Sequence, residues 1–197
     1  LNIMKDAVSK GSGSSVGHIF FEDHEARFAK INRICCPTGL SHLDAKDVFN
    51  GGLSRGEIGV IVAPTGVGKS HWLVQMGAES IRRGKNVIHY TFELSETAVG
   101  IRYDSNLTGI DSSDIIDNKE KVLEHYDNND YGRLIIKQYP TGSASIVTIR
   151  NHIEKLSMKD FVPSLIVLDY ADIMRSTRQY DSLRHELKLV YEELRNL

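Results

Sequence analysis

The most constraining feature of this sequence is the stretch APTGVGKS at positions 63–70. It has the spacing of a P-loop, with Ala63 where glycine is usual. An apolar run at 58–62 precedes the stretch, and a helical pattern at 70–83 follows it. A strand, a loop and a helix in this order are the context that a P-loop needs, so we predict a phosphate-binding loop here.

The small residues of this stretch allow the backbone to curl, so that the N–H groups from Gly66 to Ser70 point at phosphate oxygens. The helix N-terminus adds a partial positive charge. Lys69 is predicted to reach the β and γ phosphates, and the Ser70 hydroxyl to ligate Mg²⁺. The simpler alternative is a glycine-rich turn that happens to hold a lysine. The predicted nucleotide-binding residues of the loop are Ala63, Pro64, Thr65, Gly66, Val67, Gly68, Lys69 and Ser70.

A second ligand for the metal ion is predicted at the end of another apolar run. Asp169 follows the four apolar residues 165–168, which is the Walker B arrangement of P-loop proteins. We therefore predict that Ser70 and Asp169 hold Mg²⁺, with ATP or another NTP as the bound nucleotide.

A catalytic carboxylate is predicted after the apolar run 86–92. Glu93 follows this run directly, at the strand end where open α/β sheets bind ligands. A carboxylate there can orient and deprotonate an attacking water. We predict Glu93 and Lys69 as the catalytic residues. The alternative is that Glu93 only caps the next helix with Ser95 and Glu96.

The order of elements predicts an α/β fold. Runs at 86–92, 133–139 and 165–168 indicate strands, and apolar stripes at helical spacing lie between and after them. Alternating strands and helices give a mostly parallel sheet flanked by helices. The stretch SKGSGSSVG at 9–17 reads as a linker, so we divide the chain into a linker or docking segment, 1–35, and a core, 36–197.

Composition narrows the setting. The formal net charge is −2, with 24 basic and 26 acidic side chains, so the overall field gives no nucleic-acid footprint. No apolar run is long enough to cross a membrane. The only two cysteines, Cys35 and Cys36, are adjacent, which suits neither an ordinary disulfide nor a zinc site and favours a reducing cytoplasm.

Four stretches give the chain a resemblance to the RecA-like core and, more narrowly, to DnaB-type replicative helicases. They are GGLSRGEIGVIVAPTGVGKS, VIHYTFELSE, GRLIIKQYPTG and FVPSLIVLDYADIM, and the last two look most similar to the helicases of T-even-like tailed phages. The resemblance covers about residues 37–197. The P-loop is common to a superfamily, whereas the strand before Glu93 and the KQYPTG turn are more discriminating.

This resemblance implies a RecA-like P-loop NTPase that assembles into a hexameric ring, hydrolyses ATP at subunit interfaces and moves along single-stranded DNA to unwind duplex. It also implies primase as a partner, and the cytoplasm of a bacterial cell or a phage-infected host as the location. Lys69, Ser70, Glu93 and Asp169 match motif positions of the family. The family's glutamine sensor, DNA-binding loops and arginine finger are expected to lie outside this chain.

Other functions share this site chemistry. A RecA- or KaiC-like ATPase acting in recombination or regulation would carry the same residues, and a nucleotide-binding assembly module would bind without turnover. A P-loop kinase for small molecules is disfavoured, because the sequence shows no arginine cluster suited to a lid over the phosphates.

Overall fold

The computed structural model describes residues 20–21, 34–177 and 182–197. The chain divides into two units, Leu1–Arg33 and Ile34–Leu197, and the secondary structure described below belongs to the second unit. The predicted linker and docking segment at 1–35 therefore falls almost entirely outside the described residues.

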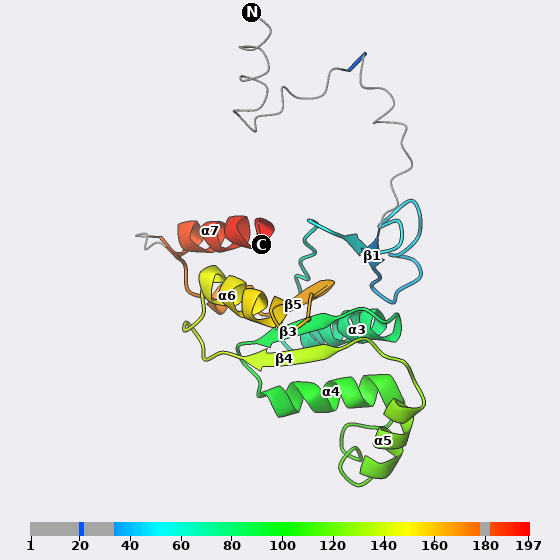
Figure 1. Ribbon diagram of the computed structural model, residues 1–197. Coiled ribbons are helices and arrows are strands. Elements are labelled where there is room, and N and C mark those ends of the chain that lie inside the picture. Colours follow the sequence, from blue (N-terminus) through cyan, green and yellow to red (C-terminus); the bar gives the residue numbers. More distant parts are fainter. Residues whose placement is uncertain (1–19, 22–33, 178–181) are drawn as a thin grey trace, which may run out of the picture. The chain divides into compact units, whose positions relative to one another are not determined.

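A three-stranded parallel sheet forms the centre of this unit (Figure 1). Its strands are β3 (Val87–Thr91), β4 (Leu134–Gln138) and β5 (Leu165–Asp169), in the order β4-β3-β5. The parallel prediction is confirmed, and all three strands lie within the predicted apolar runs, except that β5 extends through Asp169. In register, Thr91 lies between Gln138 of β4 and Asp169 of β5, so the three strands end at the same edge.

Helices cover both faces of the sheet, as predicted. On one face, α3 (Lys69–Arg82) and α4 (Glu96–Thr108) pack on the strands around Val87 and Val167. On the other, α6 (Ile146–Ser157) and α7 (Leu183–Arg195) pack around Ile88 and Tyr90. Strand β3 supplies both clusters because its side chains alternate between the two faces.

Smaller elements lie outside these layers. Helix α5 (Lys119–Asp127) contacts α4, and a short 3₁₀ turn, η1 (Ala171–Ile173), follows β5. Strands β1 (Cys35–Cys36) and β2 (Leu53–Ser54) form a separate antiparallel pair that sequence patterns did not predict.

Helix α3 runs antiparallel to the strands. Ile81, near its C-terminus, belongs to the same apolar cluster as Val87 and Leu165, the first residues of β3 and β5. Gly84, in the left-handed region at φ 70°, then returns the chain to β3, as is usual after the end of a helix. The N-terminus of α3 is consequently directed to the edge where the strands end.

The strand predicted at 58–62 is not formed, and this prediction is wrong for the described chain. The segment has no strand assignment, and Ile58, Val60 and Val62 are exposed. Strands form only by pairing, and within the described residues β5 pairs with β3 alone and no strand pairs with 58–62. Among the helices that the structure describes, none is long and apolar enough to span a membrane.

Candidate nucleotide-binding site

The P-loop stretch leads directly into α3. Gly66 and Gly68 adopt left-handed backbone conformations, with φ of 82° and 95°, which a side chain would strain. Gly68 is the N-cap of α3, where no side chain caps the helix and no acidic residue occupies the first turn. The first backbone N–H groups of α3 are thus not capped by a side chain and remain available for an anion.

Lys69 turns back onto its own loop in this structure. Its Nζ donates to the carbonyl oxygen of Ala63 at 2.8 Å and lies 3.5 Å from that of Pro64. Lys69 and Ser70 are half-buried, and the other residues of the tip, from Pro64 to Val67, are exposed. The ammonium therefore sits inside the curl of the loop, and a phosphate entering the loop would compete for it with these two carbonyls.

Asp169 ends β5 and is buried, with 5% of its surface exposed. Its backbone carbonyl accepts from the Phe92 N–H at 2.9 Å, whereas its carboxylate accepts no hydrogen bond from the described part of the chain. A buried carboxylate with open lone pairs and a serine hydroxyl are oxygen donors of the kind that Mg²⁺ prefers. Ser70 and Asp169 thus fit the predicted metal.

Glu93 lies in the bend between β3 and α4, and its side chain is exposed. It takes no part in capping α4. Ser95 is the N-cap and accepts from the Ala98 N–H at 3.1 Å. Glu96 accepts from the Gln138 N–H at 3.0 Å and from Lys137 Nζ at 3.2 Å, contacts that hold the pKa of Glu96 below its usual value. The capping interpretation of Glu93 therefore has no support in the structure.

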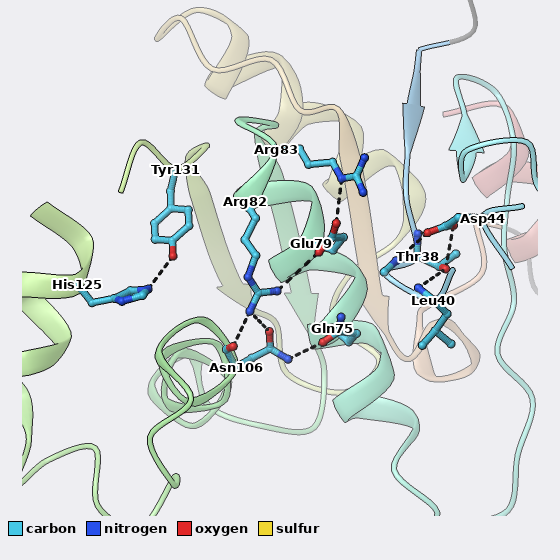
Figure 2. Close-up of polar contacts among 11 residues, drawn as sticks. Thr38, Leu40, Asp44, Gln75, Glu79, Arg82, Arg83, Asn106, His125 and Tyr131 are labelled. Carbon is cyan, nitrogen blue, oxygen red and sulfur yellow. Dashed lines mark hydrogen bonds and ion pairs between the residues drawn. The ribbon is translucent and has the colours of Figure 1, made fainter. Parts of the chain in front are cut away.

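Polar contacts join the middle and C-terminal end of α3 to the C-terminal end of α4 (Figure 2). Arg82 Nη2 donates to the Asn106 carbonyl at 2.5 Å and to its side-chain oxygen at 2.9 Å, and lies next to Glu79. Asn106 in turn donates to Gln75 at 2.8 Å. These contacts hold α3 and α4 together, and both helices pack on the same face of the sheet.

A cavity of about 340 Å³ opens between these helices. Arg102 is one of its lining residues, and its side chain is half-buried. One of its lining residues, His71, directly follows Ser70 in the sequence. Its lining residues are His71, Trp72, Val74, Gln75, Arg102, Ser105, Asn106 and Ser112.

The topology directs the predicted residues to one edge of the sheet. The antiparallel run of α3 directs Lys69 and Ser70 there, and the shared register of β3 and β5 puts Asp169 and the Glu93 bend at neighbouring strand ends. Thr91, whose hydroxyl bonds across this bend, was not among the predicted site residues, although a threonine two residues before the acid was a visible signal.

The fold and these features define a RecA-like P-loop nucleotide-binding protein. Comparison with protein families narrows the class: the model of the DnaB-like helicase C terminal domain matches residues 35–197. The chain belongs to this family, which confirms the expected resemblance.

Individual relatives agree with this assignment. The chain is 32% identical over 207 residues to the DnaB-like replicative helicase of Enterobacteria phage T4, an alignment that covers 100% of this chain and 44% of the relative. It is 22% identical over 167 residues to the replicative DNA helicase DnaB of Helicobacter pylori strain 26695, covering 82% of the chain and 33% of the relative. The chain thus spans less than half the length of these curated relatives.

Two solved structures share the fold. One, described as the structure of a DnaB-like replicative helicase and its interactions with primase, superposes with a TM-score of 0.70 at 15% identity, covering 99% of this chain and 49% of the other. The second, described as an ATPase domain, gives a TM-score of 0.69 at 15% identity, covering 94% of this chain and 66% of the other.

Proposed function

We propose that this chain is the motor domain of a replicative DNA helicase, which hydrolyses ATP to translocate on single-stranded DNA and unwind duplex. The observation that carries the proposal is that the fold directs a P-loop helix, a buried acidic strand end and an exposed acidic bend to one sheet edge. The family match and the replicative helicases among the relatives support the coupling to DNA.

Each residue has a distinct role in the proposed reaction. The N–H groups from Gly66 to Ser70 bind the phosphates, and Lys69 leaves the Ala63 carbonyl to contact the β and γ phosphates. Ser70 and Asp169 hold Mg²⁺, which when bound neutralises part of the phosphate charge.

Glu93 acts on the attacking water. It accepts a proton from the water as the water oxygen bonds to the γ-phosphorus. The bond from that phosphorus to the β,γ-bridging oxygen breaks, and ADP leaves with the electron pair of that bond. The products are ADP and inorganic phosphate. The exposed position of Glu93, with no role in the helix cap, leaves its carboxylate available for this water.

We infer further that the protein works as a homo-oligomer, with a hexameric ring as the form that the family implies, in the cytoplasm of a bacterial or phage-infected cell. A net charge of −2 gives a single chain little electrostatic attraction for DNA. In a ring, several subunits can surround one strand of DNA and hold it through local contacts. Primase is proposed as a partner, since one structural relative is described together with its interactions with primase.

The test is ATP hydrolysis by the longest form of the protein that assembles, measured with and without single-stranded DNA. Parent protein is compared with Lys69→Ala and Glu93→Gln. We expect DNA to stimulate turnover, and both substitutions to lower kcat by about a hundredfold or more, as expected for loss of a phosphate contact or a general base. Glu93→Gln should still bind ATP, because the P-loop is intact.

The control for folding is the midpoint of thermal unfolding without nucleotide, which should change little in Glu93→Gln because the side chain is exposed. Hydrolysis that DNA does not change, in an assembled ring, would contradict the helicase function and favour a recombination or regulatory ATPase.

A further inference from the structure

We propose that Thr91 is a positioning residue for Glu93: its buried hydroxyl closes the bend that carries the catalytic carboxylate. This inference rests on the role proposed for Glu93 above, and adds a residue that neither the P-loop nor the Walker B pattern contains.

Thr91 is the last residue of β3 and is fully buried, with an exposed fraction of 0%. Its Oγ1 donates to the Leu94 carbonyl oxygen at 2.9 Å and accepts from the Leu94 N–H at 3.0 Å. One hydroxyl thus satisfies both backbone groups of the residue that follows Glu93. Because the Thr91 side chain bonds the backbone three residues further along the chain, residues 91–94 form a closed bend.

The backbone next to Glu93 is also held from both neighbouring strands. The Phe92 N–H donates to the Asp169 carbonyl at 2.9 Å, and its carbonyl accepts from the Thr141 hydroxyl at 3.3 Å. The Thr91 carbonyl accepts from the Tyr139 N–H at 3.0 Å. The bend is therefore tied to the strand end that carries the proposed metal ligand and to the turn after β4.

Glu93 is the member of this bend whose side chain is exposed, while residues 91 and 92 are buried and Leu94 is half-buried. The backbone is fixed and the carboxylate faces solvent. This arrangement suits a group that must hold a water in one place, since displacement of a catalytic group by about 1 Å can lower a rate roughly a hundredfold.

Threonine provides a clean test because valine has nearly the same shape without the hydroxyl. Thr91→Val would leave the Leu94 N–H and carbonyl without their partner in a half-buried place, so the bend should relax to find others. Thr91→Ser keeps the hydroxyl and removes one methyl group. The comparison separates hydrogen bonding from packing.

Thr108, the last residue of α4, offers a matched control. Its Oγ1 donates to the Asp104 carbonyl at 2.7 Å and accepts from the Ile110 N–H at 3.2 Å, which is the same two-sided pattern far from the Glu93 bend in sequence. Thr108→Val therefore removes the same kind of hydrogen bonds at the other end of the helix.

The experiment measures ATP hydrolysis, nucleotide affinity and thermal unfolding for Thr91→Val, Thr91→Ser and Thr108→Val in the assembled protein. We expect Thr91→Val to lower kcat by about tenfold to a hundredfold while the Kd for ATP changes less than about threefold, because the P-loop is not touched. Thr91→Ser and Thr108→Val should keep kcat within about threefold of the parent.

Three results would overturn the inference: a parental kcat in Thr91→Val, an equal loss in Thr108→Val, or a loss of ATP affinity as large as the loss of kcat. If Thr91→Val does not fold, Thr91→Cys replaces it, since the thiol is a weak donor and acceptor. Its kcat should then fall between those of the parent and Glu93→Gln, and a parental value would overturn the inference.

A double variant separates this inference from the proposed function. In the Glu93→Gln background, adding Thr91→Val should change residual hydrolysis less than about threefold, because the group it positions is already absent. Additive losses would show that Thr91 acts by another route. If Glu93→Gln alone leaves kcat unchanged, the catalytic role of Glu93 fails, which is a different result from a silent Thr91→Val beside an inactive Glu93→Gln.

Discussion

At the scale of single residues, the core contains a buried polar pair next to the site. His89 is fully buried in β3, and its Nδ1 lies 2.9 Å from the Tyr103 hydroxyl of α4. Its Nε2 has no hydrogen-bond partner among the described residues. Gly77 of α3 faces this pair, because a Cβ there would meet the Tyr103 oxygen. The small Gly77 leaves room for the Tyr103 hydroxyl between α3 and α4, and this hydroxyl bonds the buried imidazole of His89 in the sheet.

This pair predicts acid sensitivity. Burial, and then the positive charge of Arg102, lower the pKa of His89 from 6.5 to about 4. Between these two pH values, His89 is protonated in the unfolded chain and neutral in the folded chain. The contribution of His89 to stability is therefore fully present above pH 6.5 and is lost as the pH falls toward 4. The free energy of unfolding, measured by urea denaturation, should fall by about 2 kcal/mol from about pH 7 to about pH 5 through this residue.

The control for that prediction uses a second histidine. Burial also lowers the pKa of His152, but this side chain is only half-buried. His89→Asn should therefore flatten the fall in stability much more than His152→Asn does. Equal slopes in the parent and in His89→Asn would show that His89 titrates alike in the folded and unfolded states.

At the scale of elements, sequence patterns predicted most of the core because they report local burial. The runs that became β3, β4 and β5 were predicted within one or two residues, and an apolar helical stripe was predicted between β4 and β5, where α6 lies. The register that sets Thr91 opposite Asp169 was not predictable, since it depends on pairing between distant segments. The capping of α4 by Ser95 alone was left open, because Glu93 and Glu96 stand at equally plausible positions in the sequence.

The segment 58–62 shows where local pattern fails. Its apolar residues have the composition of a buried strand, yet strands form only by pairing. In the described residues β5 has a partner on one side, and Val62 is 89% exposed. The apolar pattern therefore indicates that the segment is suited to a strand, whereas no strand pairs with it among the described residues.

This exposed segment predicts self-association of the 197-residue chain. Exposed apolar residues and an open strand edge both favour association between molecules. Sedimentation over a concentration series should show association that Val60→Lys together with Val62→Lys reduces. Met158→Lys is the matched control, because Met158 is 85% exposed but belongs to the end of α6. Unchanged association in the double variant, or an equal decrease with Met158→Lys, would contradict this prediction.

At the scale of the whole molecule, the parts of the proposed reaction divide between one chain and an assembly. The P-loop, Ser70, Asp169 and Glu93 all belong to a single chain, and the fold directs them to one edge. Binding of the phosphates and Mg²⁺ should therefore need no partner. Coupling to DNA is different, because a net charge of −2 gives one chain little attraction for a polyanion.

A thermal-shift experiment on the 197-residue chain tests this division. A non-hydrolysable ATP analogue with Mg²⁺, at about a hundred times its Kd, should stabilise the folded state by about 2.7 kcal/mol. For a chain of this size that corresponds to a rise in Tm of roughly 5–10 °C. Glu93→Gln should keep the rise and Lys69→Ala should lose most of it, because of these two side chains Lys69 alone is proposed to contact the phosphates. Single-stranded DNA should add no further rise. No rise in the parent, or the same rise in Lys69→Ala, would mean that the phosphates are not held by this loop within one chain.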